Sequence, residues 1–513
     1  MEPLMEPQLD IHDIQGHVFP GFGTNHSVVI AFKLQDPIEG RAALASLLPE
    51  VTKMVDSLRM RELRREAAIA GLPYPRQEAP SLAISIAATA LRLWGHDTSG
   101  FDPSFHGGMR DDAASLGDPI GSASRPVDWT FGTGEQDRVD VLLIAGHSEE
   151  ALLRQAVERW RSMLVPCLTP VLTEYGRRRP GDKEFFGFKD GISQPAMRGV
   201  TPDGEYVSRR VIASDDPRSD LYARPGQLLI WPGSFLFGYP QQTTPLTRPG
   251  APVPPPVPWM RHGSYLVFRR LLQHVRAFRE AVKGMEQHLT QQGENVPEGW
   301  VAAHLVGRWP DGTPLTASPE TPDPDISNNR NRINNFRFFA SLSPTPLADT
   351  GDPPETLPAV PADPLGLACP RVSHIRQVNP RDGISEIGQE HHPGKLMLRR
   401  GIAFGPEEEE APNADRGLLF LAYQTSIVEQ FKFVQVTWAN ATQRPTGDGR
   451  DPIIGQDGTL ETQRRIQLFA PSRRQRRCPF NGRWVVATGG GYFVTPSMSG
   501  LRYLLNIDED APH

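Results

Sequence analysis

The stretch CPRVSHIRQVNPRDGISEIGQEHHPGKLMLRRGIAFG, residues 369–405, concentrates more chemically suggestive side chains than any other part of this chain. His374 lies in a short apolar and basic segment and is followed by Asn379-Pro380-Arg381. The basic pair Arg399-Arg400 comes 25 residues after that histidine. His374 matches no zinc pattern such as His-x3-His, and a lone histidine is more often a surface or core residue than a ligand. These residues alone leave the role of His374 open.

A second stretch, FFGFKDGISQP at residues 185–195, surrounds Asp190 with glycine and phenylalanine. An Asp-Gly pair is ordinarily a turn without a chemical role. Here Gly187 and Gly191 allow a flat ligand to approach the backbone closely, and the aromatic residues would exclude water. A carboxylate held in such a place can move a proton between two atoms of a bound substrate. The stretch therefore favours a ligand-binding loop that carries an acid–base residue.

Length and composition indicate a globular protein of several units. The 513 residues exceed one ordinary core and suggest two to four domains. A hydrophobic content of 38%, a charged content of 22% and a net charge of -6 argue against a general nucleic-acid-binding protein, which would usually be basic. Part of the 51 prolines and 47 glycines falls in residues 240–259 and 343–370, which we expect to be surface insertions.

The cysteines and the N-terminus indicate a reducing compartment. Cys167, Cys369 and Cys478 are widely spaced without a Cys-x2-Cys motif, which favours reduced thiols over disulfides or a zinc site. The first residues are acidic and resemble no export signal, and no apolar run approaches the ~20 residues needed to span a bilayer. We expect a cytoplasmic protein with no membrane partner. The four glutamates at 407–410 are expected to form a solvated face.

The spacing of apolar residues predicts an alternation of strands and helices. The first strands are expected at 27–33, 81–87 and 140–146, with helices at 39–68 (interrupted at Pro49), 88–93 and 148–164. A similar order begins again, with strands at 227–230, 265–268, 418–423 and 491–494 and helices at 270–289 and 425–439. This order indicates an α+β protein with antiparallel sheets and a duplicated arrangement.

Together these stretches resemble a known family. GFKDG at 187–191 is similar to the GxxDG signature of the dye-decolourising peroxidases, a haem peroxidase family. Further blocks resemble those of the family in the same order: DIQGHVFPGF (13–22), VGRWPDGTPL (306–315), SHIRQVNPR (373–381), RRGIAFG (399–405), GLLFLAYQ (417–424), DPIIG (451–455) and GGGYFVTP (489–496). The GxxDG signature alone is weak evidence, whereas its combination with HIRxxNPR and RRG is strong. The length and the proline-rich insertions resemble the larger, elaborated subgroup.

The resemblance implies a fold and a cofactor. The fold would be α+β, with two ferredoxin-like domains of antiparallel sheets and peripheral helices. The first domain would span residues 1–215, including the GxxDG loop, and the second would span residues 216–513. The second domain would hold most of the pocket for one haem b per chain.

The resemblance also implies roles for individual residues. His374 matches the proximal ligand of the haem iron, Asp190 the distal acid–base residue and Arg399 the distal arginine. Asp451 resembles the carboxylate that hydrogen-bonds the proximal imidazole. The other implied cofactor-binding residues are Gly191, Ile192, Ser193, Arg376, Asn379, Pro380, Arg381, Leu418 and Phe420.

Two assignments have alternatives. Arg400 competes with Arg399 for the distal role, because alternation along a strand lets only one of the pair point inward, and the motif favours Arg399. No histidine lies beside Asp190 or Arg399 in the sequence, so a distal histidine would have to come from elsewhere, such as His262 or His304.

The implied chemistry suits these residue types. A neutral imidazole provides one axial ligand to haem, and a carboxylate behind it raises its basicity. A carboxylate with an unperturbed pKa of about 3.9 can accept a proton from peroxide, and an arginine can stabilise the negative charge that develops. The implied function is a haem peroxidase that reduces hydrogen peroxide through an oxoferryl intermediate and oxidises bulky aromatic donors such as dyes and phenolics.

Other functions and routes stay open. The alternative is a protein that binds haem or handles iron with little turnover, and a family member that binds no haem is a third hypothesis. Bulky donors would deliver electrons through surface tryptophans or tyrosines, of which there are nine each. The sequence decides neither the physiological donor nor whether the protein is a monomer or a homodimer.

Overall fold

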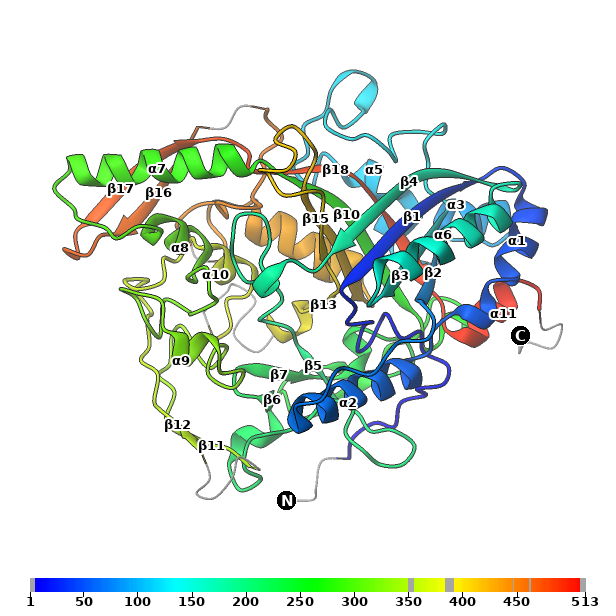
Figure 1. The fold of residues 1–513 in the computed structure, drawn as a ribbon, viewed down its shortest axis with the longest axis horizontal. Helices are drawn as coiled ribbons and strands as arrows, with labels where there is room; N and C mark the ends of the chain where they lie inside the picture. The colour runs from blue at the N-terminus through cyan, green and yellow to red at the C-terminus, as the bar shows by residue number, and fades with distance from the viewer. Residues whose placement is uncertain (1–4, 349–354, 383–391, 446, 461–462, 508–513) are drawn as a thin grey trace.

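The computed structural model describes residues 5–348, 355–382, 392–445, 447–460 and 463–507 (Figure 1). Its centre is a nine-stranded sheet with the order β10-β18-β2-β3-β1-β4-β14-β15-β13. Strand β10 also pairs with β15, so eight strands close into a ring and β13 extends it beside β15. The bounds are β1 His26–Leu34, β2 Ser81–Ala87, β3 Val141–His147, β4 Leu168–Arg177, β10 Ser264–Gln273, β13 Leu398–Arg399, β14 Ile402–Phe404, β15 Gly417–Gln424 and β18 Val485–Thr495.

The ring joins the two halves of the chain. Strands β1 to β4 come from the first 180 residues and the other five from the rest. One junction pairs Phe493 of β18 with Ala87 of β2, and the other pairs Phe404 of β14 with Gly176 of β4. All pairs in this sheet are antiparallel, which confirms the predicted α+β class with an antiparallel sheet.

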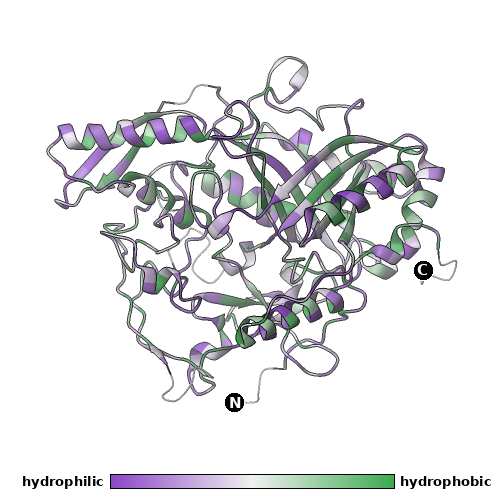
Figure 2. Ribbon diagram, in the orientation of Figure 1, coloured by the Kyte–Doolittle hydropathy of each residue, from purple (hydrophilic) through white to green (hydrophobic). Residues whose placement is uncertain are grey.

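Helices cover the outside of the ring. Helix α6 (Glu150–Leu164) buries Leu153, Val157, Trp160 and Leu164, whose spacing puts them on one face against β3. The other long helices are α1 (Pro37–Ala45), α2 (Met54–Ala70) and α7 (Val275–Gln291). The shorter ones are α3 (Ala88–Leu93), α4 (Pro103–Gly107), α5 (Met109–Asp112), α8 (Trp300–Val306), α9 (Pro324–Ser327), α10 (His374–Val378) and α11 (Met498–Leu504). Figure 2 shows the hydrophobic residues concentrated on the central strands and hydrophilic ones on the outward turns of α7.

Small sheets lie around the ring. Their strands are β5 (Ala196–Met197), β6 (Tyr222–Arg224), β7 (Gln227–Ile230), β8 (Pro240–Gln242), β9 (Pro249–Pro252), β11 (Thr345–Pro346), β12 (Thr356–Leu357), β16 (Gln463–Phe469) and β17 (Gln475–Asn481). The predicted insertion at 240–259 contains the pair β8–β9, and the insertion at 343–370 contains β11–β12, with residues 349–354 outside the described part of the chain. The pair β16–β17 lies beside α7 (Figure 1).

Three predicted elements differ from the structure, and the strand expected at 491–494 already begins at Val485. The strand expected at 265–268 continues to Gln273, so α7 begins at Val275 and not at residue 270. The helix expected at 425–439 consists of two π-helical segments, η8 (Ile427–Lys432) and η9 (Val434–Ala439). The interruption expected at Pro49 is present as the 3-10 turn Leu48–Glu50 between α1 and α2.

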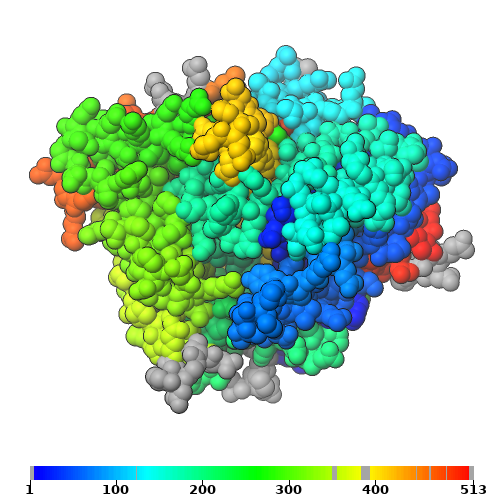
Figure 3. Space-filling view, in the orientation of Figure 1, coloured from blue at the N-terminus to red at the C-terminus, as the bar shows by residue number. Residues whose placement is uncertain are grey.

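The acidic run at 407–410 is partly held by arginines. Glu407 pairs with Arg177 and Arg179, and Glu408 pairs with Arg276 and Arg279 of α7. Glu409 and Glu410 are exposed. Figure 3 shows this segment in yellow between α7 in green and cyan to teal residues from the first half of the chain. Among the described helices, none combines the length and apolar character that crossing a bilayer requires.

Candidate active site

A cavity of about 320 Å³ is bordered by strands β10, β15 and β18 of the ring and by helix α10. One wall consists of alternate residues from neighbouring strands, because such residues share a face of a sheet. Leu271 of β10 pairs with both Leu418 of β15 and Ala487 of β18, and all three line the cavity. Phe420 lies two residues along β15 on the same wall. These positions make the wall apolar at its centre, and Arg269, which pairs with Phe420 and forms an ion pair with Asp118, adds a charged group beside them.

His374 lines the same cavity from the first turn of α10. Its Nδ1 lies 2.8 Å from Oδ2 of Asp451, which is completely buried. The other carboxylate oxygen of Asp451 accepts the backbone N–H groups of Ile453 (2.8 Å) and Ile454 (2.9 Å). Because Nδ1 is engaged by Asp451, Nε2 is the ring nitrogen that remains for a ligand in the cavity.

The environment of His374 favours its positive charge. Burial lowers the pKa of the imidazole, but the charge of Asp451 and its hydrogen bond outweigh burial, so the pKa is raised overall. Arg399 lowers this pKa and Asp190 raises it by smaller amounts. His374, Arg399 and Asp190 are therefore close enough to interact electrostatically.

A tight hairpin holds Asp190. The carboxylate of Glu184 accepts the backbone N–H groups of Phe186 and Phe188, both at 2.8 Å, and the side chain of Gln273 on β10 donates to it as well. Gly187 has a φ of +98°, which suits glycine in the turn. Glu184, Phe186, Phe188 and Asp190 all line the cavity. Burial raises the pKa of Glu184, while these hydrogen bonds act in the opposite direction.

Asp190 itself lies at the end of this hairpin. Its backbone N–H donates to the carbonyl of Asp182 at 2.9 Å, and its carboxylate accepts the N–H of Gly191 at 2.6 Å. Asp190 lines the cavity and is exposed. The position leaves the carboxylate free to exchange protons with a molecule in the cavity.

Arg399 enters the cavity and Arg400 does not. Arg399 lies on β13 opposite Ala422 of β15, and its guanidinium donates to the carbonyl of Ser193 at 2.9 Å. Burial lowers the pKa of Arg399, and the charge of Asp190 acts in the opposite direction. Arg400 points away and donates to the carbonyls of His17 (3.2 Å) and Val18 (2.9 Å).

The structure brings most of the other predicted residues to the cavity. Those that line it are Gly191, Ile192, Ser193, Asn379, Arg381, Leu418 and Phe420. Pro380 is buried and Arg376 is 1% exposed, and neither lines the cavity. Arg376 instead donates to the carbonyl of Cys369 at 2.9 Å and lies over the ring of Phe338. It follows His374 by two residues on a helix, so the two side chains point in different directions.

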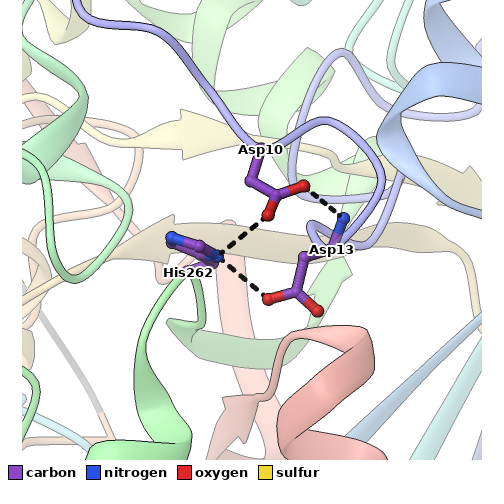
Figure 4. Close-up of side chains that lie close together, drawn as sticks. All are labelled: Asp10, Asp13 and His262. Atoms are coloured by element: carbon purple, nitrogen blue, oxygen red, sulfur yellow. Dashed lines mark hydrogen bonds and ion pairs between the residues drawn. The ribbon is translucent and has the colours of Figure 1, made fainter.

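His262 and His304, the two candidates for a distal histidine, lie outside the cavity. His262 has its Nδ1 2.9 Å from Asp13 and 4.0 Å from Asp10, in a cluster that joins the N-terminal segment to the turn before β10 (Figure 4). His304 is 2% exposed on α8, stacks on Trp300 and has its Nδ1 2.8 Å from the carbonyl of that residue. Neither histidine lines the cavity.

Some residues of the site are absent from the sequence-based prediction. Glu184 and Gln273 act through a contact between segments 89 residues apart, which no local pattern reveals. Arg308 lies within the quoted block at 306–315, and its guanidinium donates to the carbonyls of Gly312 and Ile333, both at 2.8 Å. Arg308 lines the cavity next to Arg381, and burial lowers its pKa to about 9. The one signal in the sequence is the position of Arg308 inside the family-like block at 306–315.

The residues that line the cavity fit a haem. His374 offers one imidazole nitrogen, Ile375, Val378 and Ile453 add apolar surface, and Arg308 and Arg381 add positive charge for carboxylate groups. A Cβ built on Gly191 would meet no atom within 4 Å, so the wall leaves open space there. The carbonyl oxygen of the Asn379 side chain is buried without a partner among the described residues.

The surface aromatic residues are few. None of the nine tryptophans is exposed, and Trp94 and Trp259 are half-buried. Tyr74 and Tyr206 are exposed by 66% and 53%. Neither the tryptophans nor these tyrosines line the cavity.

Known proteins that are similar to this chain are named as dye-decolorizing peroxidases. Residues 13–180 match a family model described as the DyP dimeric alpha+beta barrel domain. The chain is 29% identical to the dye-decolorizing peroxidase msp1 of Mycetinis scorodonius, covering 97% of this chain and 88% of that one, and 27% identical to a multifunctional dye peroxidase of Amycolatopsis sp., covering 96% of both. Among solved structures, an ancestral D-type dye decolorizing peroxidase matches with a TM-score of 0.73 at 28% identity, covering 97% of this chain and 99% of that one. The decolorizing peroxidase of Auricularia auricula-judae matches with a TM-score of 0.71 at 26% identity, covering 97% and 100%.

Proposed function

This chain belongs to the dye-decolourising peroxidases, a family of haem enzymes, and we propose that it reduces hydrogen peroxide with electrons from dyes and other aromatic donors through Asp190, Arg399 and His374. The proposal includes one haem b per chain in the cavity of 320 Å³. The relatives reported above are named as peroxidases, and no observation favours haem handling without turnover.

His374 would hold the iron through Nε2, with Asp451 fixing the ring and its tautomer. The apolar residues Leu418 and Phe420 would exclude water from the cavity. Asn379 and Arg381 would bind the carboxylate edge of the cofactor. When bound, haem supplies the redox chemistry that accepts two oxidising equivalents from peroxide and returns them one at a time to donors.

Asp190 and Arg399 perform the proton transfer and the charge stabilisation. Asp190 takes a proton from one oxygen of hydrogen peroxide and delivers it to the other, so that the leaving oxygen departs as water. Arg399, held by the carbonyl of Ser193, stabilises the negative charge that develops on the leaving oxygen. The hairpin centred on Glu184 keeps Asp190 at this place.

One observation carries the proposal. A single cavity places a carboxylate-backed imidazole, His374 with Asp451 at 2.8 Å, together with a carboxylate and a guanidinium that interact with it electrostatically. Such a set offers one ligand nitrogen for iron together with an acid–base group and a cation for peroxide.

Rapid mixing of the haem-loaded protein with hydrogen peroxide tests the proposal. We expect Asp190→Asn to retain the ferric haem spectrum and to react with peroxide about 10²- to 10⁴-fold more slowly, as for the loss of a general base. Arg399→Leu should also retain haem and lose about 10²-fold or more. Asp203→Asn, a change on an exposed loop, is the control and should react like the unaltered protein.

Two outcomes would contradict the proposal. A ferric spectrum that peroxide only bleaches, with no turnover of a dye, would favour haem handling. An unchanged rate in Asp190→Asn would remove Asp190 from the reaction.

A further inference from the structure

A second cavity, of about 390 Å³, lies beside the first. The two cavities share Ser193, Gln194, Asn379 and Arg381, so they adjoin along these residues. The volume falls in the range of about 300–1,000 Å³ that is typical of small-molecule sites. A molecule in the second cavity would therefore lie next to the proposed haem site.

The second cavity is lined mainly by apolar residues. Leu228 of β7, Leu246 of the insertion at 240–259 and Leu396 contribute aliphatic surface. Phe336 and Tyr222 contribute aromatic rings. Surfaces of this kind bind an aromatic ring through dispersion and stacking contacts.

Most of the charged groups in its lining already have partners. Arg218 forms an ion pair with Asp216 and donates to the hydroxyl of Thr345 at 2.8 Å. The carboxylate of Asp382 accepts the backbone N–H groups of Phe338 (2.7 Å) and Ala340 (2.8 Å). These two charges are therefore used by the fold.

Arg337 and Arg381 leave an excess of positive charge. In the described part of the chain, neither guanidinium forms an ion pair with a carboxylate, and Arg337 donates to the hydroxyl of Tyr222 at 3.0 Å. Arg381 donates to the carbonyl of Phe336 at 2.9 Å and to Asn334. Burial lowers the pKa of Arg381 to about 10, and the charge of Arg337 adds to that effect. Arg381 is assigned above to the carboxylate edge of the cofactor, so Arg337, which lines only the second cavity, is the guanidinium that an anion there would complement.

We propose that this second cavity binds a small aromatic carboxylate of the phenolic-acid class as an electron donor. The carboxylate would bind Arg337, and the ring would lie against Leu228, Leu246 and Phe336. The proposal rests on the peroxidase function above. Each donor molecule gives up one electron and its phenolic proton, and two donors convert one hydrogen peroxide into two waters. A neutral phenol would leave Arg337 without its anion.

Binding of 4-hydroxy-3-methoxybenzoate and of its methyl ester to the resting haem-loaded protein, measured by calorimetry, tests the proposal without turnover. We expect the acid to bind more tightly than the ester. Arg337→Gln should weaken the acid about 10- to 100-fold, as expected for a lost charge-assisted hydrogen bond, and leave the ester unchanged. Arg330→Gln, an exposed arginine of the same segment that lines neither cavity, is the matched control.

Steady-state kinetics then links the site to electron donation. The Michaelis constant for the acid should rise in Arg337→Gln by the same factor, while the constant for the ester stays unchanged. Benzoate, which has the anion but no phenol, should compete with the acid without being oxidised. Leu246→Trp fills the cavity without changing Arg337 and should weaken both the acid and the ester.

Three results would overturn the inference. Equal affinity of the acid and the ester in the unaltered protein would mean that Arg337 recognises no carboxylate. Loss of haem from Arg337→Gln would mean that this arginine serves the cofactor. Oxidation of the acid with a Michaelis constant unaffected by both variants would place electron donation elsewhere. If no donor is oxidised but the acid still binds through Arg337, the peroxidase proposal fails while the binding site stands.

Discussion

The contact between His374 and Asp451 is the residue-scale feature on which the proposed cofactor binding depends. Asp451→Asn keeps the shape of the side chain and removes the charge that holds the imidazole. Because partners behind a metal ligand orient it and raise its basicity, we expect haem affinity to fall about 10- to 100-fold. Titration of haem into the apoprotein measures the change. Asp448→Asn, an exposed aspartate three residues earlier, should bind haem normally, and equal affinities for the two variants would contradict the assignment.

Because His304 is buried, the free energy of unfolding is expected to decrease as the pH falls. Burial lowers its pKa to about 3 in the folded protein, against an ordinary value of about 6.5 in the unfolded chain. The unfolded chain therefore binds an extra proton below pH 6.5, and stability is lost as the pH falls from about 6.5 towards 3. From these values the loss attributable to His304 between pH 7 and pH 5 is about 2 kcal/mol.

His304→Asn tests this dependence, because asparagine can still donate to the carbonyl of Trp300 but does not titrate in this range. Urea unfolding at pH 7 and pH 5 should show a smaller loss of stability in the variant than in the unaltered protein. The same loss in both proteins would mean that His304 is protonated in the folded state.

Residue identities in the site could be predicted from motifs, but contacts across the chain could not. The resemblance named His374, Asp190 and Arg399, and all three line one cavity. Arg376 and Pro380 share a motif with His374 yet do not line the cavity. For Arg376 the reason is that a helix turns side chains two residues apart in different directions, whereas Pro380 lies beyond the end of α10. Glu184 and Arg337 carry no local signal, since their surroundings come from distant segments.

At the scale of elements, the hairpin that holds Asp190 is anchored to β10 by Gln273. Gln273→Leu removes one hydrogen-bond donor from the buried carboxylate of Glu184. We expect unfolding to become easier by about 1–3 kcal/mol and the reaction with peroxide to slow, because Asp190 is held less firmly.

Urea unfolding and rapid mixing with peroxide measure the two effects. Gln291→Leu, at the exposed end of α7, is the control and should change neither property. A slower reaction without any loss of stability would mean that Gln273 acts directly in the cavity that it lines.

Two of the mispredicted elements differ from the prediction for separate physical reasons. The segment RRLLQ at 269–273 continues β10 because β15 and β18 pair with its two edges, and this pairing prevails over helical spacing. The segment at 427–439 is helical as expected, but its π-helical form depends on packing around the cavity, where Phe431, Val434 and Gln435 contribute to the lining.

At the scale of the whole molecule, the sequence pattern predicted the α+β class and a duplicated order of elements. It could not predict that the strands close into one ring, because the pairings of Ala87 with Phe493 and of Gly176 with Phe404 join distant segments. The division into two ferredoxin-like units at residue 215 stays a prediction.

Closure of the ring also depends on the order in which the strands are synthesised. Strand β2 ends at Ala87, and its neighbour β18 begins at Val485, so the ribosome must add nearly 400 further residues before that edge of β2 can be covered. At about 5–20 residues per second this delay lasts roughly 20–80 seconds. During that time the nascent chain presents an uncovered strand edge, which is the kind of surface that chaperones bind and that pairs wrongly with other chains. The ring of strands can therefore close only after the last tenth of the chain has been synthesised.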